Sequence, residues 1–141
     1  MMHVYKRGQI ATEYLIVISF VTFIVISVMG IALMYSTDIK DNIRISQLDK
    51  FSDKLTTTSE SIFYAGEPSK TTIQVYLPEG VSQIRIINKE IIFNISTSKI
   101  QAIKVYESKV SLNGTISTHT GVKNLLISAN STFVNINEIT G

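Results

Sequence analysis

The chain has 141 residues, which is enough for one small domain. Its 13 basic and 11 acidic side chains give a formal net charge of +2, and no cluster of lysine and arginine recurs that would indicate a nucleic-acid-binding protein. The absence of cysteine excludes disulfides and thiolate metal sites.

The first predicted element is a long apolar helix. Between Glu13 and Asp38 the sequence has no acid or base other than tyrosine, and most residues are Ile, Val, Leu, Phe or Met. At about 1.5 Å per residue this stretch covers roughly 36 Å, more than the roughly 30 Å of a hydrocarbon core. The apolar residues fall on all sides of the helix, which suits lipid or burial in a bundle. We therefore predict a transmembrane or filament-core segment over residues 14–37.

A short basic leader precedes this helix. Lys6 and Arg7 are followed by Gly8 and then by Gln9. A secretory signal peptide would have a shorter apolar region that ends in a small-residue cleavage site, and none follows here. Gly8 has no side chain to exclude from a protease, and the two basic residues would hold the leader among anionic headgroups. A cut after Gly8 would leave the whole apolar helix on the mature chain.

The segment Arg7-Gly8-Gln9, followed by Ala-Thr-Glu-Tyr-Leu at residues 11–15 and then by the apolar run, resembles the archaeal prepilins with a class III signal peptide. Those proteins belong to the type IV pilin superfamily. The resemblance implies that a membrane-embedded aspartic prepilin peptidase cuts between Gly8 and Gln9 and removes residues 1–8. Gln9 would then be the first mature residue and Glu13 the fifth, where the superfamily carries its glutamate.

Glu13 has two interpretations. A carboxylate near a helix N-terminus is stabilised by the helix dipole by about 0.3–1 kcal/mol, and this needs no partner. In lipid or a bundle, however, an unpaired carboxylate costs at least about 2.5 kcal/mol, so that a partner is expected. The resemblance implies one, the new amine of Gln9 on a neighbouring subunit. This charge pair would align subunits in register during assembly.

The helix is predicted to continue, now amphipathic, to residue 66. A stripe for one partner surface is formed by Ile39, Ile43, Leu48, Phe51, Leu55 and Ile62, mostly at helical spacings with one five-residue step. The charged residues between them, including Asp41 and Arg44, are predicted to face water. Gly66 and Pro68 provide the signal that ends the helix.

Residues 67–141 are predicted to form a small β-sandwich head. The β-rich runs are 73–77, 82–87, 90–96, 100–106, 110–112, 115–118, 122–128 and 132–136. Asn113-Gly114 is predicted to be a two-residue hairpin turn. Short turns and no intervening helix indicate an antiparallel sandwich. A core this small needs further apolar surface, so we expect the stripe of the helix to pack against one sheet. The expected fold is therefore α+β, and the long helix followed by a β-head is type IV pilin-like.

The sequence offers little chemistry. The only histidines are His3 and His119, which are too far apart in the chain to suggest a ligand set. No phosphate-binding loop or nucleophile motif is present. Four aspartates are predicted to lie on a solvated helix surface: Asp38, Asp41, Asp49 and Asp53. We therefore expect no catalytic residue, cofactor or metal.

Three glycosylation sequons fall in the predicted head, at Asn94, Asn113 and Asn130. Asn113 and Asn130 are predicted to lie in turns, where an acceptor would be exposed, whereas Asn94 is predicted to lie within a strand. Glycans there would shield exposed sheet edges on the outside of a filament.

The functional expectation is a structural subunit, a major or minor pilin, of an archaeal type IV pilus-like surface filament that serves adhesion. The precursor would lie in the cell membrane with its N-terminus in the cytoplasm and its head outside, although Lys40, Arg44 and Lys50 compete with the basic leader in setting that orientation. The expected partners are other copies or related pilins, membrane lipids and, as the resemblance implies, the peptidase, an assembly ATPase and a membrane platform protein. The alternative is a monomeric, single-pass anchored extracellular binding protein, and an enzyme is the least favoured class.

Overall fold

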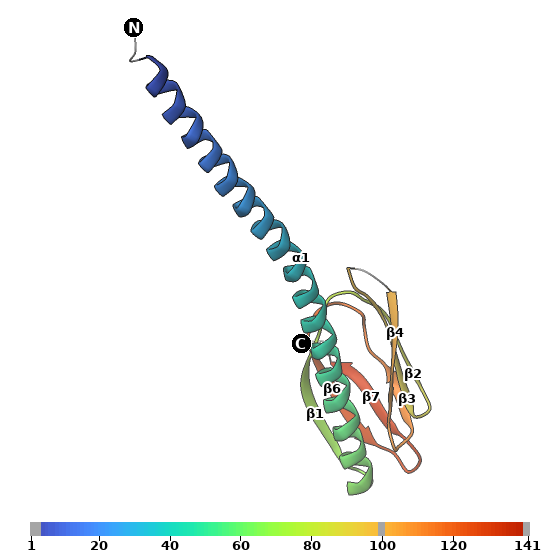
Figure 1. Ribbon diagram of the computed structural model, residues 1–141. Coiled ribbons are helices and arrows are strands. Elements are labelled where there is room, and N and C mark those ends of the chain that lie inside the picture. The colour runs from blue at the N-terminus through green and yellow to red at the C-terminus, as the bar shows by residue number, and fades with distance from the viewer. Residues whose placement is uncertain (1–3, 99–100, 140–141) are drawn as a thin grey trace. The chain divides into compact units, whose positions relative to one another are not determined.

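A computed structural model of the chain shows one long helix followed by a β-sheet domain, an α+β fold (Figure 1). It describes the backbone of residues 4–98 and 101–139, and the side chains from residue 10 onward within these ranges. The chain divides into two compact units, Met1–Ile39 and Lys40–Gly141. The first unit is the apolar part of the helix, and the second contains the rest of the helix and all described strands.

Helix α1 (Val4–Ala65) is continuous. It contains no proline, and it ends where the sequence predicts, because Gly66 adopts a positive φ of 81°. The amide of Gly66 donates to the carbonyl of Phe63 at 3.1 Å and closes the last turn. The helix is described from Val4, so Gly8 and Gln9 lie within its backbone.

Seven strands follow the helix and form two sheets. Their bounds are β1 (Lys70–Leu77), β2 (Val81–Ile87), β3 (Glu90–Ser96), β4 (Gln101–Glu107), β5 (Leu112–Thr115), β6 (Gly121–Ala129) and β7 (Val134–Ile139). The four-stranded sheet has the order β1-β6-β7-β5, and the three-stranded sheet has the order β2-β3-β4. Among the described pairs, β5 and β7 are parallel and the others are antiparallel, so the expected antiparallel sandwich is only partly right.

The hydrophobic core lies between the inner faces of the two sheets and one face of α1. Side chains alternate along the strands, so that every second residue is buried. From the helix, Leu48, Phe51 and Leu55 are buried in the same cluster, as the stripe predicts. The ring of Phe51 packs edge-to-face on Phe93 of β3, with 5.8 Å between centroids. Burying each such side chain contributes about 1.5–3 kcal/mol.

The predicted stripe is wrong at its N-terminal end. Ile39 and Ile43 are exposed, whereas Asp41 is buried. Asp41 lies seven residues, or about two turns, before Leu48 and therefore shares its face. Ile43 lies five residues before Leu48 and is rotated away from that face. The five-residue step from Ile43 to Leu48 in the predicted stripe is the point at which the two faces separate.

The predicted Asn113-Gly114 hairpin is also wrong. Both residues lie inside β5, which pairs in parallel with β7. The register places Gly114 opposite Ile136. Glycine is required there by close approach to the neighbouring strand, not by a turn.

Helix α1 covers one open side of the sandwich. Lys54 Nζ on α1 donates a hydrogen bond of 3.2 Å to the backbone carbonyl of Gln74 in the edge strand β1. After the edge strand β4, the amide of Lys109 donates to Glu60 Oε1 at 3.0 Å. On β4 itself, the Tyr106 hydroxyl donates to Asp49. Side chains of the helix therefore satisfy backbone and polar groups along two sheet edges that would otherwise be open to pairing.

Candidate functional site

The main candidate site is the surface of the first unit. Every large apolar side chain described between Ile10 and Tyr35 is exposed, for example Phe23 at 69 %. The helix is long and apolar enough to cross a membrane. Because these side chains surround the helix on all sides, this surface suits lipid or a bundle of similar helices.

Two serine hydroxyls in this apolar surface bond to the helix itself. Ser19 Oγ donates to the carbonyl of Leu15 at 2.8 Å, and Ser27 Oγ donates to that of Phe23 at the same distance. Each bond reaches back four residues along α1. These two hydroxyls therefore need no external partner, which is the arrangement required in an apolar medium.

Glu13 is the one acid between Ile10 and Tyr35, and its side chain is exposed. Gly8 and Gln9 lie in the helical backbone of α1. The side chains of Lys6, Arg7 and Gln9 lie outside the described residues, so the structure describes no contact of Glu13 with Gln9. Tyr14 and Tyr35, at the two ends of the apolar run, are both exposed.

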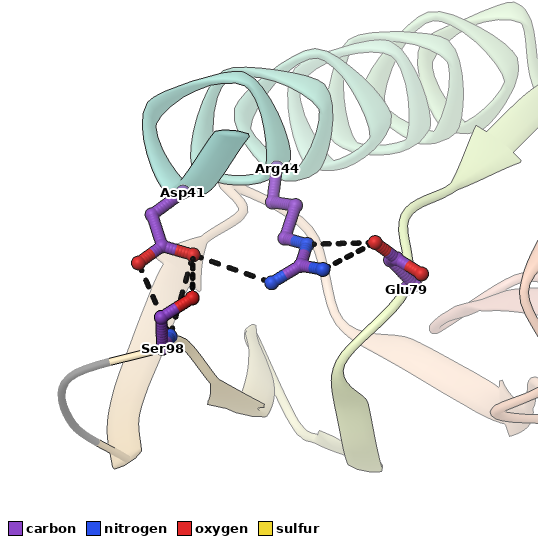
Figure 2. Close-up of polar contacts among 4 residues, drawn as sticks. All are labelled: Asp41, Arg44, Glu79 and Ser98. Carbon is purple, nitrogen blue, oxygen red and sulfur yellow. Dashed lines mark hydrogen bonds and ion pairs between the residues drawn. The ribbon is translucent and has the colours of Figure 1, made fainter. Parts of the chain in front are cut away.

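A polar cluster at the start of the second unit was missed by the sequence argument (Figure 2). Asp41 accepts hydrogen bonds from the Ser98 amide at 3.1 and 3.3 Å and from its hydroxyl at 3.2 Å. Arg44 Nη1 donates to Asp41 at 3.2 Å, and Arg44 Nε donates to Glu79 at 3.1 Å. The cluster joins α1 to the turn after β1 and to the segment before β4.

The charge of Arg44 is balanced within this cluster. Its hydrogen bonds to Glu79, supported by the two carboxylate charges, raise the pKa of Arg44 against the effect of desolvation. Two carboxylates therefore face one guanidinium.

A second buried network lies between β6 and β7. Lys123 Nζ donates to Glu138 Oε1 at 2.8 Å and to the hydroxyl of Ser117, and its side chain is 7 % exposed. Ser117 also donates its amide to Glu138 Oε2 at 2.8 Å. Desolvation raises the pKa of Glu138, but the bonds from Lys123 and Ser117 outweigh it and lower the pKa overall. An ion-paired ammonium cannot act as a base toward Ser117, so this network is structural.

The remaining polar candidates are dispersed. His119 is exposed, and no group of three or more histidine, aspartate or glutamate side chains in the described part of the chain could hold a metal ion. A groove of about 460 Å³ runs between α1 and β4, where Asp49 is already engaged by Tyr106. Neither place assembles a set of reacting groups.

The sequon asparagines lie on three different strands or turns. Asn113 in β5 and Asn130 after β6 are exposed. The Asn130 carboxamide accepts a hydrogen bond from the Ser131 amide at 2.8 Å. Asn94 is half-buried on the outer face of β3, the central strand of its sheet.

Comparison of the chain with protein-family models, with curated proteins and with solved structures found no match. The functional argument therefore depends on the chain's own residues.

Proposed function

We propose that this protein is the structural subunit, a major or minor pilin, of an archaeal type IV pilus-like surface filament. The observation that carries the proposal is the first unit, a helix apolar on all sides in which the hydroxyls of Ser19 and Ser27 bond to its own backbone. Such a surface is stable in a bilayer as a precursor and in a helix bundle after assembly. The β-domain would then lie on the outside of the filament and serve adhesion.

Transfer of an apolar helix from lipid to a bundle gains little hydrophobic energy, because lipid tails are as apolar as the side chains. Assembly must therefore depend on close packing and on polar pairs. Glu13 supplies such a pair if the leader is removed, since the amine of Gln9 on a neighbouring subunit can meet it. An ion pair of this kind forms only between correctly aligned chains.

The proposal carries specific partners. A prepilin peptidase would cut between Gly8 and Gln9, and an assembly ATPase with its membrane platform protein would extract the mature helix from the bilayer. The precursor would be held in the cell membrane with the leader in the cytoplasm. Mature subunits would be found in surface filaments.

The first experiment is intact mass measurement and N-terminal sequencing of the protein from sheared cell-surface material. A chain that begins at Gln9 in high-molecular-weight filaments is the expected result. A chain that retains Lys6 and Arg7 and occurs only in the membrane fraction would refute the proposal. It would favour the anchored monomeric binding protein instead.

The second experiment separates cleavage from assembly. Glu13→Gln removes the charge without changing the shape of the side chain, and we expect normal cleavage with filament yield reduced at least about tenfold, the equivalent of about 1.4 kcal/mol. The control is Glu67→Gln, which removes an exposed acid beyond the end of α1. Equal filament yield from both variants would show that Glu13 has no assembly role.

A further inference from the structure

A cleft of about 510 Å³ lies where three segments of the β-domain meet: the turn between β2 and β3, the segment that leads into β5 and the connection between β6 and β7. Its polar lining consists of four neutral residues that can form hydrogen bonds: Asn88, Ser111, Asn113 and Thr132. Phe133 and aliphatic residues of β2 and β5 complete the lining. This size and composition are typical of a small-ligand site, which joins apolar surface to a few polar groups.

Backbone hydrogen bonds hold the three segments of the cleft together. Asn88 lies in the turn between β2 and β3 with a φ of 54°, a conformation that asparagine tolerates. Its carbonyl accepts a hydrogen bond from the amide of Leu112 at the start of β5. The carbonyl of Ser111 accepts one from the amide of Val134 at 2.8 Å, at the start of β7. No lining side chain is used in these bonds, so the cleft exists before any ligand binds.

Phe133 is an aromatic residue without a place in the hydrophobic core. It is half-buried, and it belongs neither to the described core cluster nor to the side chains packed against that cluster, whereas Phe51 and Phe93 are core residues. Its carbonyl accepts a hydrogen bond from the amide of Asn130 at 2.9 Å, which fixes the residue beside the cleft. An aromatic face of this kind can stack on the apolar C–H face of a ring-shaped ligand.

The four polar side chains of the cleft are available to a ligand. None of them forms a hydrogen bond to another group in the described part of the chain. Carboxamide and hydroxyl groups both donate and accept, which matches the hydroxyl groups of a sugar. The backbone offers less, because the amide of Leu112 already binds Asn88 and β5 already pairs with β7. An extended peptide, which binds by strand pairing, is therefore less suited to this cleft.

The cleft is uncharged. Among the described residues, no ionisable side chain lines it. Of the charged residues nearest in sequence, Lys89 and Glu90 are neighbours of opposite sign, and Lys109 pairs with Glu60 at 3.6 Å. Arg85 lies on the outer face of β2 and is not part of the lining. Recognition of a phosphate or carboxylate would need a basic side chain within the cleft, so the lining favours a neutral ligand.

We propose that this cleft binds a neutral saccharide. Phe133 stacks against one sugar ring, and the carboxamides of Asn88 and Asn113 with the hydroxyl of Thr132 bind the hydroxyl groups around it. The inference depends on the proposed function, in which the β-domain serves adhesion. It adds the chemical class of the ligand and the residues that recognise it.

The test measures saccharide binding by the full chain, purified in detergent with Asn113 unmodified, as intact mass verifies. The probes are linear hexasaccharides of glucose, of mannose and of N-acetylglucosamine, titrated in a calorimeter. At least one should bind with a Kd below about 1 mM. Phe133→Ala should raise that Kd at least about tenfold, because the stacking surface is lost. Tyr64→Ala, which removes an exposed aromatic side chain outside the cleft, should leave it unchanged.

Two milder variants keep the test independent of folding. Asn88→Gly allows the positive φ of the turn and removes the carboxamide, and Thr132→Val removes only a hydroxyl. Each should raise the Kd several-fold, since one hydrogen bond to the saccharide is lost. Chemical unfolding followed by tyrosine fluorescence shows whether each variant is folded. If Phe133→Ala does not fold, these two variants decide the inference.

Four results would overturn the inference. The first is that no hexasaccharide binds with a Kd below about 1 mM. The second is binding that is equal in the wild type and in the cleft variants, because the site would then lie elsewhere. The third is tighter binding of dextran sulfate than of dextran, which would indicate an ionic site. The fourth is retention of peptides from a casein digest without retention of any saccharide.

Failure of the inference and failure of the filament proposal are distinguishable, because binding is measured on isolated chains. Chains that begin at Gln9 in filaments but bind no saccharide would overturn the inference alone. Saccharide binding by a chain that forms no filaments would support the inference and leave the filament proposal refuted.

The saccharide can come from another molecule or from a glycan on Asn113 itself, since that residue belongs to a sequon. Thr115→Ala removes the sequon without changing a lining residue. Protein from native cells that binds the hexasaccharide equally with and without Thr115→Ala would assign the ligand to another molecule. Binding only after Thr115→Ala, with a glycan found on Asn113 in the wild type, would assign it to the chain's own glycan.

Discussion

Gly114 lies against Ile136 in the parallel pair of β5 and β7, and a β-carbon on Gly114 would stand 2.0 Å from the carbonyl oxygen of Ile136. Its φ of 142° also lies where side chains are disfavoured. Backbone atoms cannot move away without separating the two strands. The position therefore accepts glycine only.

Gly114→Ala should destabilise the β-domain by more than about 3 kcal/mol, because it combines backbone strain with a clash against a neighbouring strand. Gly121→Ala is the matched control. Gly121 has a similar φ of 131° but no atom within 4 Å of its would-be β-carbon, so it should cost only about 1 kcal/mol. Chemical unfolding can be followed by tyrosine fluorescence, since the chain has six tyrosines and no tryptophan. Equal losses of unfolding free energy in Gly114→Ala and Gly121→Ala would show that backbone strain alone, and not the clash with Ile136, destabilises the domain.

Glu138→Ala should cost about 3 kcal/mol, because it leaves the buried ammonium of Lys123 without its carboxylate. The double variant Lys123→Met with Glu138→Gln removes both charges and should be closer in stability to the wild type than Glu138→Ala. A double-mutant cycle on unfolding free energies measures the coupling. Additive single and double losses would show that the two side chains do not interact.

The loss of folding stability at acid pH should depend on Glu138. Its pKa is lowered in the folded chain, so the stabilisation is fully present above the unfolded value of about 4.5 and is lost as the pH falls through the folded value. Unfolding of the wild type and of the Lys123→Met, Glu138→Gln double variant should be compared from about pH 6 to about pH 3. The double variant should lose less stability over this range, and parallel curves would contradict the assignment.

The loss of folding stability at alkaline pH should depend on Tyr106. Burial and then the hydrogen bond to Asp49 raise its pKa, so its contribution is present below the unfolded value of about 10 and is lost as the pH rises further. Tyr106→Phe should cost about 1 kcal/mol at neutral pH and should flatten the decline above about pH 10. Tyr76→Phe, on the exposed outer face, is the control. An unchanged loss of folding stability at alkaline pH in Tyr106→Phe would rule out this cause.

Asp41→Ala should cost about 1–3 kcal/mol, because the part-buried hydrogen bonds from Ser98 and one partner of Arg44 are lost together. Asp41→Asn keeps an acceptor for the Ser98 amide and should cost less. Asp53→Ala, an exposed acid on the same helix, should change the unfolding free energy by no more than about 0.5 kcal/mol. A loss in Asp53→Ala as large as that in Asp41→Ala would mean that helix propensity and not the cluster is being measured.

The sequence alone determined the local features of this protein. The absence of charge between Glu13 and Asp38 predicted the apolar helix, and Gly66 predicted where the helix ends. Alternation of apolar residues located the strands to within a few positions, and Glu90–Ser96 matches its predicted bounds. These features depend on neighbouring residues in the chain, which a periodic pattern records directly.

The tertiary structure decided the features that depend on distant residues. Asp41 is buried because Ser98 is there to bind it, and Gly114 is in a strand because β7 pairs with β5. Lys123 tolerates burial because Glu138 lies beside it on the neighbouring strand. Lys123 and Glu138 are 15 positions apart in the chain, and Asp41 and Ser98 are 57 apart. Gly114 meets its neighbour only through the pairing of two strands. No local pattern encodes which distant partner satisfies a buried charge or which strand a glycine must approach.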